Sequence, residues 1–88
     1  MIVEVQKSFE KDMGMVTDKK LACKLNEIIE ILENCETLSE IPHLKKMTGG
    51  NNFFRIRIGN YRLGLKVIDD TITLIRFMNR KDIYKYFP

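Results

Sequence analysis

The strongest constraint on the fold lies between Phe54 and Val67, where apolar and basic residues alternate on both sides of a Gly59-Asn60 dipeptide. The apolar positions are Phe54, Ile56, Ile58, Leu63, Leu65 and Val67, and the basic positions between them are Arg55, Arg57, Arg62 and Lys66. Successive side chains of a β-strand point to opposite faces, so this alternation predicts two strands with one apolar and one basic face. Gly-Asn is a turn sequence that closes tight hairpins, and the segment is therefore predicted to be an antiparallel hairpin.

The segment before the hairpin has the periodicity of helices. Its clearest apolar stripe has spacings of four, three, four and three, and consists of Leu21, Leu25, Ile28, Leu32 and Cys35. This pattern predicts an amphipathic helix that begins at a Thr17 or Asp18 cap and ends near residues 34–36. A shorter helix is predicted from a Ser8 cap to about Met15.

Four further segments complete the predicted order. Residues 2–5 alternate weakly and residues 72–77 follow an Asp69-Asp70 turn, so both segments are predicted to be strands. Residues 37–52 are predicted to be a connection, and residues 79–88 a tail that is polar and then aromatic. The expected fold is α+β, a single domain spanning 1–88, in the order β-α-α-β-β-β. A helical hairpin is expected to pack on one face of an antiparallel sheet and to leave the opposite face basic.

Charge is divided unequally along the chain. Residues 1–42 contain five lysines and nine acidic residues, a net charge of −4, whereas residues 43–88 contain ten basic and three acidic residues, a net charge of +7. All five arginines lie in the second half. Because arginine forms bidentate contacts with phosphate, this asymmetry favours a nucleic-acid-binding face on the sheet.

Other features narrow the class of protein. The N-terminus is too short and too acidic for a signal peptide, and no apolar run approaches the length that spans a membrane. Cys23 and Cys35 would lie about 18 Å apart on the predicted helix, beyond the reach of a disulfide. Free thiols and a cytoplasmic location are therefore expected. With no CxxC pair and a single histidine, His43, no metal site is expected, and a chain of 88 residues leaves no room for a large cofactor pocket.

Two motifs resemble the RelE/ParE superfamily of bacterial and archaeal type II toxins. One is the segment from Phe53 to Leu63 with Leu44-Lys45-Lys46 before it, and the other is Asn79-Arg80-Lys81-Asp82-Ile83-Tyr84. The likeness covers nearly the whole chain, and the pair of motifs is specific for the superfamily but less specific for the activity within it. It implies a RelE-like endoribonuclease that cuts mRNA in the ribosomal A site without a metal. In that reaction the 2′-OH attacks the adjacent phosphate and the 5′-oxygen leaves, and a cognate antitoxin neutralises the toxin.

The resemblance also implies the residues of the site. The positions that match the superfamily's catalytic residues are Arg55, Arg57, Arg62, Arg80 and Tyr84. The further basic residues expected to contact RNA are Lys45, Lys46, Lys66, Arg76 and Lys81. Arginine suits the stabilisation of a phosphorane because it remains charged, and for the same reason it is a poor base.

Two departures from the superfamily pattern leave alternatives open. Asn79 stands where many relatives have histidine, and Met78 stands where the best-known RelE-type enzymes carry a further arginine, a role that Arg76 would have to take. The alternatives are a ParE-like inhibitor of DNA gyrase and a non-catalytic member that only binds its antitoxin. His43 is the only side chain of the type that exchanges protons near neutral pH, but its position after Pro42 in a connection is more typical of a loop or cap residue.

Overall fold

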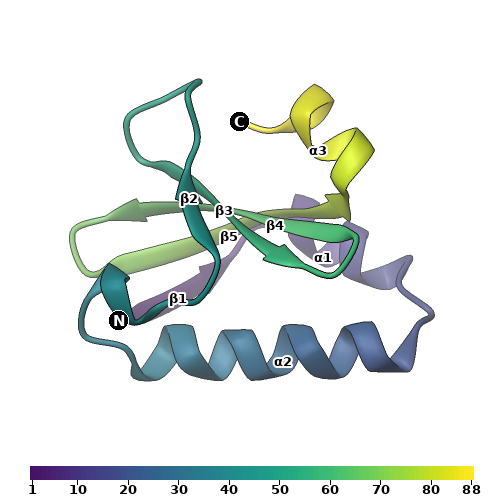
Figure 1. The fold of residues 1–88 in the computed structure, drawn as a ribbon, viewed down its shortest axis with the longest axis horizontal. Coiled ribbons are helices and arrows are strands. Elements are labelled where there is room, and N and C mark those ends of the chain that lie inside the picture. The colour runs from purple at the N-terminus through teal and green to yellow at the C-terminus, as the bar shows by residue number, and fades with distance from the viewer.

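A five-stranded sheet separates α1 and α2 from α3 in the computed structural model, which describes every residue from Met1 to Pro88 (Figure 1). The elements are β1 (Ile2–Val5), α1 (Lys7–Gly14), α2 (Lys19–Asn34), a 3₁₀ turn (Leu38–Glu40), β2 (Leu44–Lys46), β3 (Phe53–Ile58), β4 (Tyr61–Ile68), β5 (Thr71–Asn79) and α3 (Arg80–Tyr86). The predicted α+β class is confirmed, and β2 and α3 are additions to the predicted order. None of the three helices combines the length and the apolar character needed to cross a membrane.

The alternating segment forms the predicted hairpin at the centre of the sheet. β3 and β4 are antiparallel, with Arg57 opposite Arg62 and Arg55 opposite Gly64. Gly59 opens the turn with a φ of +59°, a conformation that glycine adopts without steric cost. The strand order is β1-β5-β4-β3-β2, and β1 pairs with β5 in parallel, so the predicted antiparallel arrangement holds for four of the five strands.

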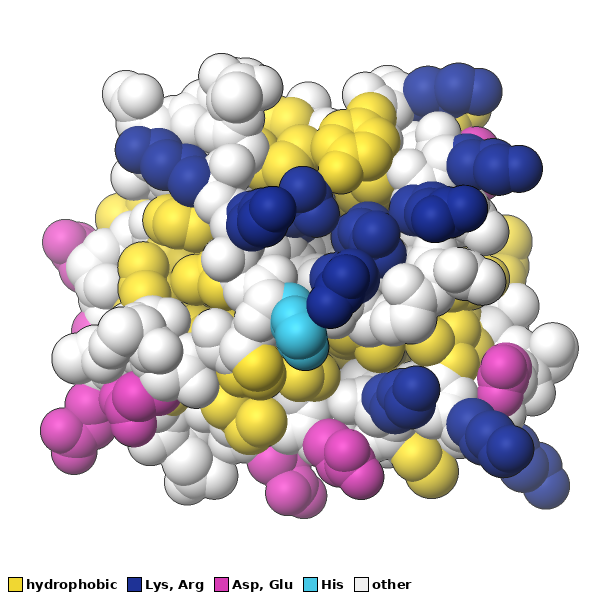
Figure 2. All heavy atoms as spheres, viewed as in Figure 1, with side chains coloured by type: hydrophobic (Ala, Val, Ile, Leu, Met, Phe, Trp, Pro, Cys, Tyr) yellow, Lys and Arg dark blue, Asp and Glu magenta, His cyan; other side chains and the backbone are white.

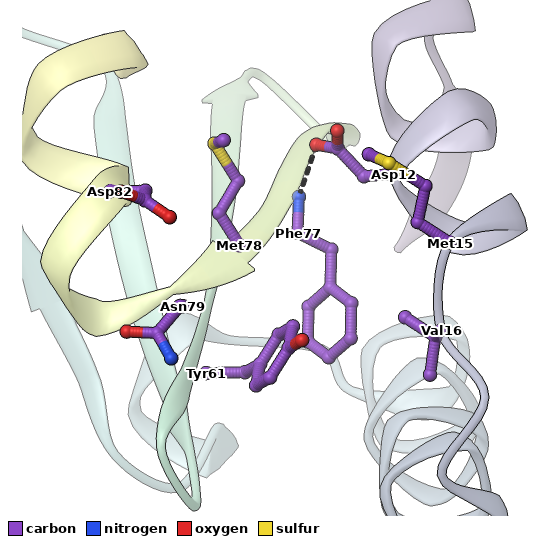
Figure 3. Close-up of a pocket in the computed structure, with 8 residues that line it drawn as sticks. All are labelled: Asp12, Met15, Val16, Tyr61, Phe77, Met78, Asn79 and Asp82. Atoms are coloured by element: carbon purple, nitrogen blue, oxygen red, sulfur yellow. Dashed lines mark hydrogen bonds between the residues drawn. The ribbon is translucent and has the colours of Figure 1, made fainter.

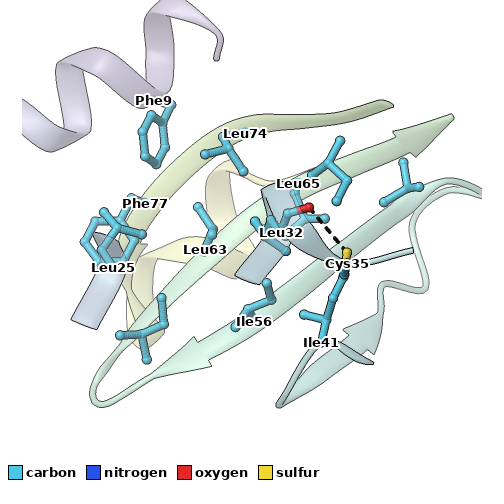
Figure 4. Close-up of a cluster of buried hydrophobic side chains, with 13 residues drawn as sticks. Phe9, Leu25, Leu32, Cys35, Ile41, Ile56, Leu63, Leu65, Leu74 and Phe77 are labelled. Atoms are coloured by element: carbon cyan, nitrogen blue, oxygen red, sulfur yellow. Dashed lines mark hydrogen bonds between the residues drawn. The ribbon is translucent and has the colours of Figure 1, made fainter. Parts of the chain in front are cut away.

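The main hydrophobic core lies between this sheet and the first two helices (Figure 4). Leu25 and Leu32 of α2 are fully buried against the sheet, where Ile56 and Leu63 of the hairpin are also fully buried. Phe9 brings α1 into the same cluster. Since burial of each large apolar side chain stabilises the fold by about 1.5–3 kcal/mol, the apolar face of the hairpin is fixed toward the helices. The basic residues of the hairpin must therefore face the other way.

The two predicted helix caps have different outcomes. The Asp18 carboxylate accepts hydrogen bonds from the backbone N–H groups of Lys20 and Leu21 at 2.9 and 3.3 Å, which confirms the cap of α2. The predicted Ser8 cap is wrong, because α1 begins one residue earlier, at Lys7. The Ser8 hydroxyl instead donates to the carbonyl oxygen of Ile75 in β5, and this bond ties α1 to the sheet.

A second, smaller apolar cluster lies on the opposite face of the sheet. It joins buried Met47, Ile83 and Phe87 to the partly buried Phe53, Ile75 and Met78. The tail after residue 79 therefore contains a helix, α3, that packs on β4 and β5, as Figure 1 shows. The opposite face was predicted to be basic, but α3 covers part of it with apolar contacts, and only the part beside α3 is left to the arginines.

The close approach of Phe87 to Gly64 gives a test of this packing. A Cβ atom added at Gly64 would lie 2.8–2.9 Å from three atoms of the buried Phe87 ring, closer than carbon atoms pack. We therefore expect Gly64→Ala to lower the free energy of unfolding by about 1–3 kcal/mol, the usual cost of overpacking. Gly14→Ala is the matched control, because nothing lies within 4 Å of its added Cβ. Equal thermal melting temperatures for the two variants would contradict the prediction.

Candidate functional site

Five side chains, all of them polar, surround a hollow of about 350 Å³ on the open face of the hairpin. They are His43, Lys45, Arg55, Arg57 and Arg62. Lys45 comes from β2, Arg55 and Arg57 from β3, Arg62 from β4, and His43 directly precedes β2. Figure 2 shows Lys and Arg side chains gathered beside the only histidine of the chain. The hollow therefore combines four cationic groups with one imidazole.

The strand register explains why these charges meet. Lys45 lies opposite Arg55, and Arg57 lies opposite Arg62, so the four cations occupy two rungs of the sheet that share one face, with the Ile56 rung between them. Side chains directly opposite each other in an antiparallel pair have Cβ atoms about 4.5–5.5 Å apart. Like charges at this separation repel each other, and an anion placed between them would relieve the repulsion.

Arg62 is the most constrained cation of the hollow. Its Nη1 donates to the carbonyl oxygens of Gly59 and Tyr61 at 3.0 and 2.9 Å, and its Nε is buried without a hydrogen-bond partner. Burial lowers the pKa of the Arg62 guanidinium, and the positive charge of Arg55 lowers it further. The Arg62 side chain is therefore partly buried and tied to the turn. A guanidinium held in this way is pre-positioned for an anion.

His43 is the member of the hollow that sequence reasoning set aside as a loop residue. Its Nδ1 lies 3.3 Å from Nη2 of Arg57, and its backbone φ is +59°. Left-handed backbone is uncommon for residues other than glycine, and such residues cluster at functional sites. Its position in the chain gave no signal, because β2, the three-residue strand that fixes it at the sheet edge, was predicted to be part of a connection.

Tyr84 and Arg80 lie beside the hollow on α3. The Cζ atom of Arg55 lies 5.7 Å from the centroid of the Tyr84 ring, a cation–π arrangement, and the Tyr84 side chain is 58% exposed. The backbone N–H of Arg80 donates to Asn60 in the hairpin turn at 2.8 Å, and the charge of Arg80 is one of those that lower the pKa of Arg62. The five residues expected to be catalytic are thus gathered around one place.

Most of the residues expected to contact RNA lie elsewhere. Lys45 lines the hollow, but Lys46, which pairs with Phe54, lies on the other face of the sheet. Lys66 lies opposite Phe53, outside the hollow, and Lys81 is an exposed residue in the first turn of α3. Arg76 is occupied by an ion pair, since its Nε and Nη2 donate to the two carboxylate oxygens of Asp12 at 2.8 and 3.1 Å.

The two positions that depart from the superfamily pattern have structural roles here. The Asn79 side chain accepts a hydrogen bond from the backbone N–H of Lys81 at 2.9 Å, so it caps α3. Met78 packs against the second apolar cluster. Neither residue lines the basic hollow.

A different hollow, of about 180 Å³, lies between the end of α1 and the end of β5 (Figure 3). Its lining is mostly apolar and includes Tyr61 and Phe77, whose ring centroids are 5.0 Å apart. Its only charged lining residues are the carboxylates Asp12 and Asp82, which would repel a phosphate. The basic hollow is therefore the better candidate for a site that binds nucleic acid.

Two comparisons with known sequences both find toxins. A family model described as the ParE toxin of the parDE type II toxin–antitoxin system matches residues 3–84. The chain is 40% identical to Toxin RelE3 of Methanocaldococcus jannaschii over 89 residues, which covers all of both chains.

Two solved structures extend the likeness to the fold. In the crystal structure of a RelB–RelE antitoxin–toxin complex from Methanococcus jannaschii, the similar chain is 39% identical, with a TM-score of 0.82 and coverage of 97% of this chain and 99% of that chain. A chain of the archaeal RelE–RelB complex from Pyrococcus horikoshii has a TM-score of 0.72 at 24% identity, with 90% and 93% of the two chains covered.

Proposed function

This chain belongs to the RelE/ParE superfamily of type II toxins, and on that premise we propose that it arrests translation by cleaving mRNA at the ribosome. The observation that carries the proposal is the hollow lined by Lys45, Arg55, Arg57 and Arg62, with Tyr84 beside it. The hollow has the size and the charge to take one phosphodiester group. Metal-independent chemistry is part of the proposal, because three arginines can supply the charge stabilisation that a metal ion would otherwise give.

The chemistry requires that the extra negative charge on the oxygens of the phosphorane be stabilised in the transition state. Arg55, Arg57 and Arg62 are donors that remain charged, and Arg62 is already oriented by the turn. Donors fixed before the reaction need no reorganisation as the phosphorane gains charge, and each such donor contributes about 10²–10³ in rate. Three arginines around one phosphate therefore form a credible oxyanion site.

The direct test is cleavage of mRNA on programmed ribosomes by the purified protein, with the new ends mapped by primer extension. We expect cuts within the A-site codon, and no cuts in the same mRNA without ribosomes. Intact mRNA at high protein concentration would exclude the nuclease. The toxin is treated with a chelator and dialysed before it is added to the ribosomes, which need Mg²⁺ themselves, because the proposed reaction does not depend on a divalent metal ion of the toxin.

Tyr84 is expected to contribute its ring and its hydroxyl in separable ways. The exposed ring next to Arg55 is placed to stack on an RNA base, an interaction worth about 1–3 kcal/mol per base. Tyr84→Ala should therefore raise KM by roughly ten-fold or more. Tyr84→Phe should leave KM unchanged and lower kcat, because only the hydroxyl is lost. If Tyr84→Phe raises KM as much as Tyr84→Ala does, the ring has no stacking role.

A second candidate function is the inhibition of DNA gyrase, favoured by the ParE description of the matching family model. The same cationic hollow could contact DNA held by gyrase, and Asn79 and Met78 supply none of the chemical groups found at these positions in RelE-type enzymes. A supercoiling assay with purified gyrase separates the two candidates. Inhibition of supercoiling together with intact mRNA on ribosomes would favour the gyrase inhibitor.

An antitoxin is the expected protein partner, since the similar chains from Methanococcus jannaschii and Pyrococcus horikoshii were solved in complexes with RelB-type antitoxins. We expect an acidic, partly disordered antitoxin segment to fold onto this chain. Its affinity should fall as the NaCl concentration rises from 0.1 to 0.5 M, because salt screens exposed charges. Calorimetric titration at both concentrations checks this, and an unchanged Kd would show that electrostatic contacts are not dominant.

A further inference from the structure

His43 occupies an unusual place for the only imidazole of the chain. It lines the hollow at the β2 edge, next to Arg57, whereas α3 and Tyr84 lie over β4 and β5. The strand order places β3 and its arginines between these two sides. Two side chains that can exchange protons therefore flank the proposed phosphate site from opposite directions.

The contact with Arg57 fixes the form of the His43 ring. A guanidinium has only donors, so the 3.3 Å contact between Arg57 Nη2 and His43 Nδ1 requires Nδ1 to accept. An imidazole that accepts at Nδ1 carries its proton on Nε2 and has a lone pair available on Nδ1. A phosphate in the hollow would attract the guanidinium of Arg57 and release this lone pair.

We propose that His43 is the general base of the mRNA cleavage reaction, a role that rests on the proposed function above. Nδ1 takes the proton of the 2′-OH as the 2′-oxygen forms a bond to phosphorus. The bond from phosphorus to the 5′-oxygen breaks, and the departing oxygen takes a proton that Tyr84 donates. The products are a 2′,3′-cyclic phosphate and a 5′-hydroxyl. His43 then loses its proton to water and Tyr84 regains one, so the reaction consumes no net proton.

The surroundings of His43 are consistent with a base rather than with a structural ion pair. Around the ring, the hollow presents only cations, namely Lys45, Arg55, Arg57 and Arg62. On its other side, an adjoining hollow brings Lys24 and Glu27 of α2 near the ring. The His43 ring forms no hydrogen bond to a carboxylate. Its one hydrogen-bond partner is Arg57, a residue of the proposed phosphate site.

The first test is chemical rescue of His43→Gly in single-turnover cleavage on programmed ribosomes. Glycine suits the φ of +59° at this position, so the variant should keep the fold. We expect a rate loss of about 10²–10⁴-fold, the usual contribution of a general base, and recovery of at least about ten-fold with added imidazole. Asp69→Gly is the matched control, because Asp69 also has a positive φ, +54°, and lies in the β4–β5 turn outside the hollow. It should cut at the wild-type rate.

The second test separates a base from an acid. An mRNA with sulfur in place of the bridging 5′-oxygen at the cleaved bond has a leaving group that needs no proton. We expect Tyr84→Phe to recover on this substrate and His43→Gly to remain slow. Recovery of His43→Gly on the sulfur substrate, or cleavage of ordinary mRNA by His43→Gly within about three-fold of wild type, would overturn the base role and leave the nuclease intact. A wild-type protein that cuts neither substrate would overturn the proposed function together with this inference.

Discussion

Replacing Arg62 with alanine is expected to slow ribosome-dependent cleavage by about 10²–10³-fold, the usual cost of removing one donor from an oxyanion site. Growth inhibition on induced expression should be lost as a result. Arg62→Lys should recover only part of the rate, since an ammonium group cannot reproduce the planar fork of a guanidinium. Single-turnover cleavage and growth curves measure both effects.

The same substitution should also affect stability, because Arg62 bonds to its own turn. Loss of the bonds to Gly59 and Tyr61 is expected to cost about 1–2 kcal/mol in the free energy of unfolding. Cleavage must therefore be measured well below the melting temperature of each variant. Lys19→Ala is a charge-matched control, because it removes one exposed positive charge from α2, which packs on the other face of the sheet (Figure 1). A folded Arg62→Ala protein that remains fully toxic would exclude the arginine hollow as the active surface.

Asp12→Ala is expected to cause a large loss of stability without a direct effect on the chemistry. The Asp12 carboxylate is 97% buried and binds Arg76 through both oxygens. It also accepts a hydrogen bond from the backbone N–H of Phe77 at 2.9 Å (Figure 3). Removal of one partner from a buried ion pair costs about 3–5 kcal/mol, and the partial exposure of Arg76 reduces this to about 2–4 kcal/mol. The melting temperature should fall by roughly 8 °C or more.

A matched variant distinguishes the lost contacts from the lost charge. Glu10→Ala removes an exposed carboxylate that forms no salt bridge from the same helix, and should change the melting temperature by less than about 3 °C. Asp12→Asn keeps an acceptor for the Phe77 N–H and should lie between the two. Melting of Asp12→Ala at the same temperature as Glu10→Ala would show that the bond between α1 and β5 contributes little.

The hairpin and α2 were predictable because single periodicities define them. Only one register of the two strands places all the apolar residues from Phe54 to Val67 on the same face. The Asp18 cap bonds to a residue only two positions away, so the sequence around it is enough to predict it. β2 was missed because Leu44–Lys46 is too short to show a period. α3 was missed because its first residues are polar and only Ile83 is buried within it, while Phe87 packs after the helix has ended.

The site was predictable to the extent that it lies on the hairpin. Arg55, Arg57 and Arg62 share a face because of the strand period, whereas the contacts of His43 and Asp12 join segments that lie far apart in the chain. For the same reason Arg76 could not be excluded from the RNA-contacting set by its sequence. Its partner Asp12 belongs to α1, and only the packing of α1 on β5 brings the two together.

The parallel pairing of β1 with β5 also dictates an order of events during synthesis. Ile2 is made long before its partner Thr71, so β1 cannot pair in the sheet until β5 has been translated. Pairings between such distant residues form late, because a long loop must close before any contact is gained. We expect a nascent chain that stops before β5 to lack a stable sheet and to be harmless to the ribosome that makes it.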